Sequence, residues 1–226
     1  MNKELEEYLR EFISVERWDR INNVLEQRTR KITVVLEDIY QPHNASAVLR
    51  SCDGFGIQDV HIIENRNQFD ASSEVTIGAD QWLDLHRYNK ANHDNVSECF
   101  SELRNKGYKI IATTPHEQDS NLNELDLSTP VALVFGTELE GVTDQVKEQA
   151  DAFVKIPMHG FSESFNISVS AAICLYDTTT RLRKERLDWV LSENEKSEIR
   201  IEWLKKSIKA GDQLVKRFME EHKEAH

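Results

Sequence analysis

The chain has 226 residues, of which 39% are hydrophobic and 30% charged, a composition typical of one soluble globular unit with a sizeable core. Its 28 basic and 40 acidic residues give a net charge of −12, and no stretch approaches the roughly 18 apolar residues that a membrane span requires. The N-terminal sequence MNKELEEYLREF contains acids where a secretory signal peptide has an apolar region, so we expect a cytoplasmic protein.

Two amphipathic helices are predicted at the N-terminus. The first has an apolar stripe formed by Leu5, Leu9 and Phe12. Ser14 is well placed to cap the second helix. The inward-facing residues of that helix are expected to be Trp18, Ile21 and Leu25.

The middle of the chain alternates short β-branched runs with helix-length segments. The predicted strands are residues 31–36, 60–63, 108–112, 131–135 and 153–156. The predicted helices are residues 44–56, 93–107, 143–150 and 166–183. This alternation predicts an α/β fold, with a mostly parallel sheet flanked by helices. In the last helix we expect Val169, Ile173 and Tyr176 to lie on one buried stripe.

The C-terminal part is also predicted to be helical and lies outside the strand pattern. Apolar residues recur there at a heptad-like spacing: Ile201, Leu204, Ile208, Gly211, Val215 and Phe218. This seam must pack on the core, on the N-terminal helices or on a second subunit. The predicted organisation is therefore an N-terminal helical extension (1–31), a sheet domain (32–183) and a C-terminal helical extension (184–226).

Basic residues are outnumbered in the middle of the chain but not at its ends. Residues 32–180 carry 9 basic and 23 acidic residues, residues 1–31 carry seven of each, and residues 181–226 carry 12 and 10. An anionic partner would therefore contact the terminal helices, although a charged helix face is more often only solvated.

The sequence excludes several common site types. The junction between the first strand and its helix, residues 37–44, contains no glycine, and the chain has no G-K-[ST] segment. A nicotinamide oxidoreductase and a P-loop NTPase are therefore poor candidates. The three cysteines are too scattered for a disulfide framework or a zinc cluster, so no metal site is predicted.

Two short segments have patterns that suit either function or plain structure. In H-N-A-S-A-V-L-R, Asn44 can cap a helix that carries Arg50, and the alternative is a capped surface helix with an ordinary arginine. The buried strand at 131–135 leads into Gly136, Glu138 and Gly141. Because ligands of α/β sheets bind beyond the carboxyl ends of strands, this glutamate is well placed for function, and the alternative is a solvated turn.

A third segment, residues 156–170, favours function more clearly. A strand is followed by a loop of small polar residues, and Asn166 then opens an apolar helix. A plain helix cap does not explain the serines that surround this asparagine, namely Ser162, Ser164, Ser168 and Ser170.

Together the three segments resemble the motifs of a known family. N-A-S-A-V-L-R, F-G-T-E-L-E-G and I-P-M-x-G-x-x-x-S-F-N-I-S-V-S occur in the order and separation typical of the SpoU branch of the SPOUT RNA methyltransferases. The resemblance covers about residues 14–180 and is greatest to the TrmH-type enzymes. Those enzymes use S-adenosylmethionine to methylate the ribose 2′-hydroxyl of the D-loop guanosine at tRNA position 18.

The resemblance implies a fold, an assembly and a site. The C-terminal part of the sheet domain would form a deep trefoil knot (the SPOUT fold), and a homodimer would build each active site from both subunits. The implied catalytic residues are Arg50, Asn44, Glu138, Ser164 and Asn166. The implied cofactor-binding residues are Thr113, Gly136, Ile156 and Phe165, the last replacing the leucine usual in the family.

The resemblance leaves the role of Arg50 open between two readings. Family proposals make the arginine the base that deprotonates the ribose hydroxyl, with Asn44 supporting its geometry. Guanidinium groups do not normally lose their proton in proteins. In the alternative, Arg50 remains a cation that binds the adjacent phosphate and stabilises the charge developing on the 2′-oxygen.

The resemblance also implies tRNA as the partner, captured by the terminal extensions. The candidate contacts are Arg17, Arg20, Arg28, Arg30, Lys31, Arg181, Arg183, Lys184 and Arg186. Two alternatives remain: a SpoU-type enzyme for ribosomal RNA or another tRNA position, and a non-catalytic RNA-binding scaffold.

Overall fold

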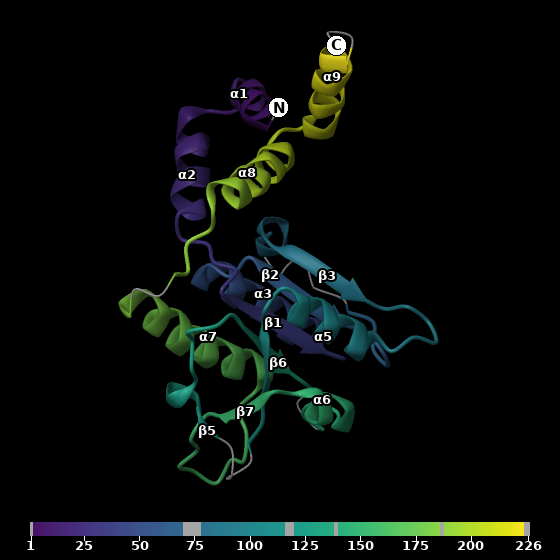
Figure 1. Cartoon of the computed structure of the whole chain (residues 1–226), viewed down its shortest axis with the longest axis vertical. Coiled ribbons are helices and arrows are strands. Elements are labelled where there is room, and N and C mark those ends of the chain that lie inside the picture. Colours follow the sequence, from purple (N-terminus) through teal and green to yellow (C-terminus); the bar gives the residue numbers. More distant parts are fainter. Residues whose placement is uncertain (1, 70–77, 116–119, 138–139, 186–187, 224–226) are drawn as a thin grey trace. The chain divides into compact units, whose positions relative to one another are not determined.

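The computed structural model describes residues 2–69, 78–115, 120–137, 140–185 and 188–223, which belong to two compact units (Figure 1). One unit is Thr29–Trp189, and the other combines Met1–Arg28 with Val190–His226. Within the described ranges, no helix is both long and apolar enough to cross a membrane.

The larger unit is built on a seven-stranded sheet in which all pairs of described strands are parallel. In spatial order the strands are β3 (Asp84–Tyr88), β2 (Asp59–Ile63), β1 (Ile32–Glu37), β6 (Val131–Phe135), β4 (Lys109–Thr113), β7 (Ala152–Lys155) and β5 (Ser120–Asn121). The predicted mostly parallel sheet is therefore confirmed. The sequence does not predict β3 or β5, because β3 is a half-exposed edge strand and β5 has only two residues.

Helices cover the two faces of this sheet. They are α3 (Pro42–Phe55), α5 (Asn95–Asn105), α6 (Asp144–Gln149) and α7 (Ile167–Lys184), with short 3-10 helices η1 (Ala79–Trp82) and η2 (Leu122–Glu124). One face of β1 packs in a core with α3 and α7, and the other face packs with α5. Since β1 and β6 are buried on both faces, their β-branched side chains form continuous apolar runs.

The start of α3 differs from the prediction. Gln41 occupies the N-cap and Pro42 the first helical position, where its fixed φ angle suits a helix start and its missing N–H costs nothing. Asn44 lies inside the first turn and does not cap the helix. Asn166, by contrast, caps α7 as predicted, and its side chain accepts a hydrogen bond from Ser168 N.

The predicted buried stripe of α7 is wrong at two of its three positions, whereas Ile173 is partly buried against the core. Val169 is 44% exposed and Tyr176 is 63% exposed. Among the described residues of α7, the buried ones are Ile167, Ala171, Cys174, Leu175, Thr178, Thr179 and Leu182. α7 packs on α3 through a face that combines small side chains such as Ala171 with larger ones such as Leu175, while Val169 and Tyr176 lie on the outer face.

The smaller unit contains helices from both ends of the chain, which are α1 (Asn2–Arg10), α2 (Val15–Leu25), α8 (Glu193–Ser207) and α9 (Gly211–Lys223). Ser14 caps α2 as predicted, accepting a hydrogen bond from Arg17 N at 3.2 Å. Leu5, Leu9, Ile21 and Leu25 are buried, but Phe12 is 46% exposed, contrary to the prediction.

The C-terminal seam is divided between two helices. α8 ends before Ile208, which has an extended backbone, and α9 begins at Gly211. A Cβ atom on Gly211 would lie 2.2 Å from the carbonyl oxygen of Lys205, so this close turn requires glycine. Both helices pack on α1, so the C-terminal seam contacts the N-terminal helices.

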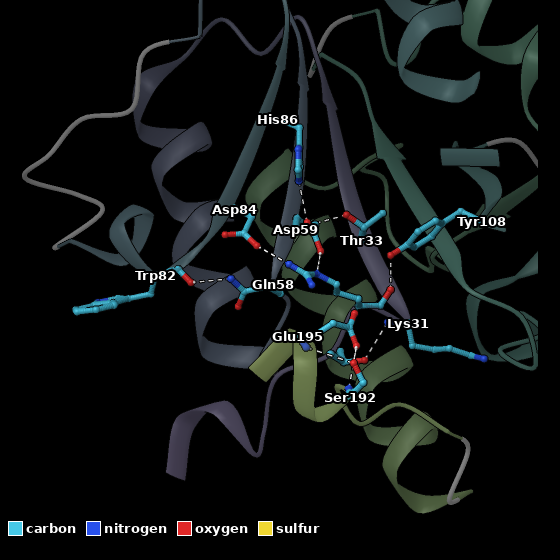
Figure 2. A network of polar contacts seen from close by, with 12 residues as sticks. Lys31, Thr33, Gln58, Asp59, Trp82, Asp84, His86, Tyr108, Ser192 and Glu195 are labelled. Carbon is cyan, nitrogen blue, oxygen red and sulfur yellow. Dashed lines mark hydrogen bonds and ion pairs between the residues drawn. The ribbon is translucent and has the colours of Figure 1, made fainter. Parts of the chain in front are cut away.

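A partly buried polar network joins β1, β2 and β3 near their amino ends (Figure 2). Arg30 Nε lies 2.8 Å from Asp59 Oδ2, and a terminal nitrogen of Arg30 lies 2.7 Å from Asp84 Oδ2. His86 Nε2 lies 2.8 Å from Asp59 Oδ1, and the hydroxyl of Thr33 donates to the carbonyl oxygen of Asp59 at 2.7 Å. Figure 2 shows Asp59 at the centre of these contacts.

The network shifts the ionisation of its members. Burial alone would lower the pKa of Arg30, but the carboxylates of Asp59 and Asp84 outweigh burial and raise it. Burial alone would raise the pKa of Asp59, but His86 and Arg30 outweigh burial and lower it. The ion pair therefore stabilises the fold while the carboxyl group is ionised.

Replacement of Asp59 tests this contribution. We expect Asp59→Asn to lower the free energy of unfolding at neutral pH by about 2 kcal/mol or more, because Arg30 loses a buried charge partner. The control Asp126→Asn, at an exposed carboxylate, should change it by less than about 0.5 kcal/mol. Urea unfolding of the three proteins measures the difference.

The same experiment has a pH dependence of known sign. Because the pKa of Asp59 is lowered in the fold, its stabilisation is present above the ordinary carboxyl pKa and is lost as the pH falls through the folded value. The difference between wild type and Asp59→Asn should therefore shrink in acid. An equal difference at about pH 7 and about pH 3 would contradict the assignment.

Candidate active site

The carboxyl ends of four neighbouring strands form one edge of the sheet. Leu36 of β1 pairs with Phe135 of β6, and Thr113 of β4 pairs with Val154 of β7, so these strands end at nearly the same level. Ligands of parallel sheets bind beyond this edge. Two cavities lie there, and both are formed by residues of the larger unit.

The first cavity has a volume of about 330 Å³ and lies beyond β4, β6 and β7. Its apolar wall includes Phe135, Val154, Ile156, Met158 and Phe165. Its polar wall includes Thr113, Glu140, Lys147, Glu163, Ser164 and Ser170. All four residues predicted to bind the cofactor, Thr113, Gly136, Ile156 and Phe165, line this cavity, together with the predicted catalytic Ser164.

Glycine forms part of this wall because two backbone segments approach each other closely. A Cβ atom on Gly136 would lie 2.0 Å from the carbonyl oxygen of Gly141. Thr137 and Gly141 exchange two backbone hydrogen bonds of 3.0 Å, and Gly141 has a φ of 68°. The predicted catalytic Glu138 lies between them in the sequence, outside the described residues.

The first and third sequence motifs meet through two asparagines. The side-chain nitrogen of Asn166 donates to Asn44 Oδ1 at 3.1 Å, and that of Asn44 donates to Gln41 Oε1 at 3.0 Å. The Asn166 oxygen accepts from Ser168 N at 2.9 Å and from Ser168 Oγ at 2.6 Å. These contacts fix the start of α7 against the start of α3.

Arg50 does not join this group within one chain. It lies six residues after Asn44 on α3, which is a rotation of about 240° around the helix axis. Its side chain is exposed and is absent from the walls of both cavities. Among the described residues, its guanidinium group has no hydrogen-bond partner, so it is available to a ligand or to another chain.

The second cavity has a volume of about 360 Å³ and lies beyond the carboxyl end of β1. It shares Thr137, Glu140, Gly141 and Ile167 with the first cavity. Its other lining residues are Glu37, Asp38, Ile39, Tyr40, Gln41, Asn44, Arg66, Asn67 and Thr143. Of these, the sequence predicts only Asn44 as a site residue. Glu37 and Asp38 directly follow the predicted strand 31–36, and two acidic residues in that place could have indicated a binding site.

Glu37 is held at the boundary of this cavity by Thr143. Its carboxylate accepts hydrogen bonds from Thr143 N at 2.9 Å and from Thr143 Oγ1 at 2.6 Å. Burial raises the pKa of Glu37, although these two hydrogen bonds oppose the shift.

The lining of the first cavity fits a nucleoside that carries an amino-acid group. Apolar side chains such as Ile156 and Phe165 suit a flat base, and backbone groups at the strand ends supply donors and acceptors. Lys147 and Glu163 carry opposite charges, which suit the carboxylate and ammonium groups of an amino acid. S-adenosylmethionine has these three parts.

Comparison with known proteins agrees with this lining. The sequence profile of the SpoU rRNA Methylase family matches residues 31–176. The chain belongs to the SpoU methylase family. The match covers the whole set of strands and the loop between β7 and α7 on which the two cavities depend.

Individual SpoU relatives match beyond this region. A Borreliella burgdorferi protein named tRNA (guanosine(18)-2′-O)-methyltransferase is 41% identical over 201 residues, which is 89% of this chain and 90% of the relative. The crystal structure of the Aquifex aeolicus TrmH/SpoU tRNA modifying enzyme has a TM-score of 0.75 at 30% identity and covers 85% of this chain and 96% of its own.

A more distant SpoU structure shares the fold. The methyltransferase AviRb from Streptomyces viridochromogenes, solved in complex with the cofactor AdoMet, has a TM-score of 0.59 at 20% identity. The match covers 76% of this chain and 65% of AviRb.

Several arginines predicted to contact tRNA have partners within the chain. Arg28 is only 1% exposed, and its guanidinium group lies 5.1 Å from the ring centre of Trp203. The prediction that Arg28 contacts tRNA is therefore wrong. Arg30 belongs to the Asp59 network. Arg181 pairs with an aspartate on its own helix and donates to two carbonyl oxygens, and Arg183 donates to the carbonyl oxygen of Phe55 at 3.0 Å.

The remaining predicted tRNA contacts are more accessible. Arg17, Arg20 and Lys184 are exposed, and Lys31 is half-buried and donates to the carbonyl oxygen of Ser128. Arg186 lies outside the described residues.

The close contact between Gly136 and the Gly141 backbone predicts that a side chain on Gly136 weakens cofactor binding. We expect Gly136→Ala to displace the Gly141 backbone, to lower the free energy of unfolding by about 1–3 kcal/mol, and to weaken binding of S-adenosylmethionine at least about tenfold. Calorimetry measures the affinity and urea unfolding the stability.

The matched control is Gly54→Ala, on the exposed side of α3. A Cβ atom there meets nothing within 4 Å, so the variant should bind the cofactor normally and gain about 0.5–1 kcal/mol of stability. Equal cofactor binding by both variants would show that the Gly136–Gly141 contact does not shape the site.

Proposed function

We propose that the chain is an S-adenosylmethionine-dependent enzyme that methylates the ribose 2′-hydroxyl of the D-loop guanosine at tRNA position 18. The observation that carries the proposal is the 41% identity to the Borreliella burgdorferi enzyme over 201 residues. That alignment is longer than the sheet unit Thr29–Trp189, so the similarity extends into the terminal helices. A SpoU enzyme that consists of the sheet unit alone would lack these helices, so the longer match favours the tRNA enzyme.

The first cavity is the proposed cofactor site. When bound there, S-adenosylmethionine supplies a methyl group activated by its sulfonium. The protein holds the two reactants close and aligned for an in-line displacement, which accounts for much of the rate of such transfers. Gly136 and Ile156 form the cofactor wall, and the Asn44–Asn166 hydrogen bond fixes the adjoining wall toward the second cavity.

We assign Arg50 the role of a permanent cation. It binds the phosphate beside the target nucleotide and stabilises negative charge on the 2′-oxygen, while phosphate, water or a carboxylate accepts the proton. The position of Arg50 on the exposed face of α3 supports a site completed by a second chain. Glu138, Ser164 and Asn166 keep the catalytic assignments that the family resemblance gives them.

The proposal includes a homodimer. Val169 and Tyr176 present apolar surface on α7, and Phe161 and Phe165 are exposed in the preceding loop. An apolar surface of this kind is typical of a subunit interface. We propose that, in this dimer, Arg50 of one chain completes the site at the first cavity of the other.

The proposal also includes the trefoil knot and a division of labour along the chain. After β7 the chain returns to α7, which packs on α3 beside the first strand, a path compatible with threading through an earlier loop. Residues 32–183 would form the knotted catalytic domain. Residues 1–31 and 184–226 would capture tRNA, in the cytoplasm where the substrate is found.

Incubation with unmodified RNA tests the activity. Purified protein is supplied with labelled S-adenosylmethionine and either a tRNA transcript or ribosomal RNA, and the digested nucleosides are identified by mass spectrometry. We expect 2′-O-methylguanosine from tRNA alone, and none from a transcript whose D-loop guanosine at position 18 is replaced. Methylation of ribosomal RNA alone would favour the other SpoU activity, and no methylation of either RNA would favour the scaffold.

The role of Arg50 has its own test. A permanent cation predicts that Arg50→Lys retains part of the rate, with a profile that stays flat between about pH 7 and pH 9.5, because lysine remains charged over this range. Single-turnover methylation across this range measures the profile. A residual rate that rises steeply toward about pH 10 would instead identify a titrating base at this position.

A further inference from the structure

The second cavity contains a carboxylate that the cofactor site does not use. Asp38 follows β1 and is only 3% exposed. Its Oδ1 accepts three backbone hydrogen bonds, from Asn65 N at 2.7 Å, Arg66 N at 2.8 Å and Asn67 N at 3.3 Å. Its Oδ2 is buried and has no hydrogen-bond partner among the described residues.

The backbone holds this carboxylate in an uncommon conformation. Asp38 has a φ of 52°, in the left-handed region that residues other than glycine rarely adopt. Its N–H donates to the carbonyl oxygen of Ile63 at 2.9 Å, and its own carbonyl oxygen accepts from the Asn67 side chain at 2.9 Å. These contacts hold the carboxylate at the wall of the second cavity, and a ligand reaches the buried Oδ2 once a small shift of that wall exposes it.

A buried carboxylate with a free oxygen selects a ligand that donates hydrogen bonds. Ionised carboxylates only accept, and an unpaired buried acceptor is costly. Among the four RNA bases, guanine alone presents two adjacent donors on its Watson–Crick edge, the N1–H and the N2 amino group. Adenine and cytosine place a ring nitrogen acceptor beside their amino group, and uracil flanks its single donor with two carbonyl oxygens.

We infer that the second cavity holds the base of the target guanosine, with Asp38 Oδ2 accepting a hydrogen bond from the N2 amino group. The inference rests on the proposed function and makes Asp38 the residue that selects guanine. Glu37 lies beside Asp38 in the same wall, but both of its carboxylate oxygens already accept hydrogen bonds from Thr143, so Asp38 carries the recognition. At about 360 Å³ the cavity has room for a nucleoside.

The arrangement of the two cavities also positions the reacting ribose. Thr137, Gly141 and Ile167 belong to both cavities, so a base in the second cavity places its ribose beside the wall of the first. Asn44 lines the second cavity and accepts from Asn166, which links this nucleotide to the third motif. A base inside such a cavity must leave the RNA stack, and base flipping has this requirement.

Inosine tests the inference because it is guanosine without the N2 amino group. Two tRNA transcripts that differ only in guanosine or inosine at position 18 are compared in steady-state methylation. With wild-type protein we expect inosine to lower kcat/KM by about tenfold or more. Equal kcat/KM for the two transcripts would overturn the inference without any variant.

Asp38→Asn assigns the selectivity to this residue. The asparagine oxygen can keep the three backbone hydrogen bonds, while an amide NH₂ replaces the free acceptor. We expect kcat/KM for the guanosine transcript to fall by about 10- to 100-fold and the preference for guanosine over inosine to fall below about threefold. An unchanged preference in Asp38→Asn would overturn the inference.

Two controls separate the possible failures. Asp126→Asn removes an exposed carboxylate outside both cavities and should keep the wild-type preference. Calorimetric binding of S-adenosylmethionine to Asp38→Asn should match wild type, because Asp38 does not line the first cavity. Lack of methylation of guanosine tRNA by wild-type protein would overturn the proposed function as well, whereas methylation with an unchanged preference would overturn only the role of Asp38.

Discussion

The carboxyl edge of the parallel sheet is the constraint on which the rest of the site depends. β1, β6, β4 and β7 end at nearly the same level because their registers are fixed by buried apolar side chains on both faces. The segments that follow these four strands therefore all begin at the same edge of the sheet. Two cavities with a common wall result, and the proposed reaction needs two reactants side by side.

The Asp59 network and the proposed site occupy opposite edges of this sheet. At the amino edge, Asp59 satisfies Arg30 and His86 with short polar contacts, and the network is well paired. At the carboxyl edge, Asp38 keeps an unpaired oxygen and a strained backbone, and a side chain on Gly136 would collide with the Gly141 backbone. Such departures from complete pairing and relaxed geometry are tolerated where a ligand completes the structure.

The sequence predicts those elements whose pattern is local and strong. β6 matches its predicted range, and Ser14 and Asn166 cap their helices as expected, since a buried run and a cap depend on few neighbours. The outer face of α7 and the break before α9 are not predictable in this way. Val169 is exposed because a different face of α7, with Ala171 and Leu175, is the one that is buried, and Gly211 is required by a close contact with the Lys205 backbone. The acidic residues that follow the first buried strand offered a signal for Asp38, but its left-handed backbone and its contacts with residues 65–67 leave no periodic pattern.

The central claim is that one reactant occupies each cavity at this edge. A crystal structure of the protein with S-adenosylhomocysteine and an unmodified tRNA transcript tests it most directly. The account predicts the adenosine part of the cofactor product against Gly136 and Ile156, and the N2 group of the target guanine within hydrogen-bond distance of Asp38 Oδ2. A cofactor product bound outside the first cavity, or a target base that remains stacked in the D-loop, would contradict it.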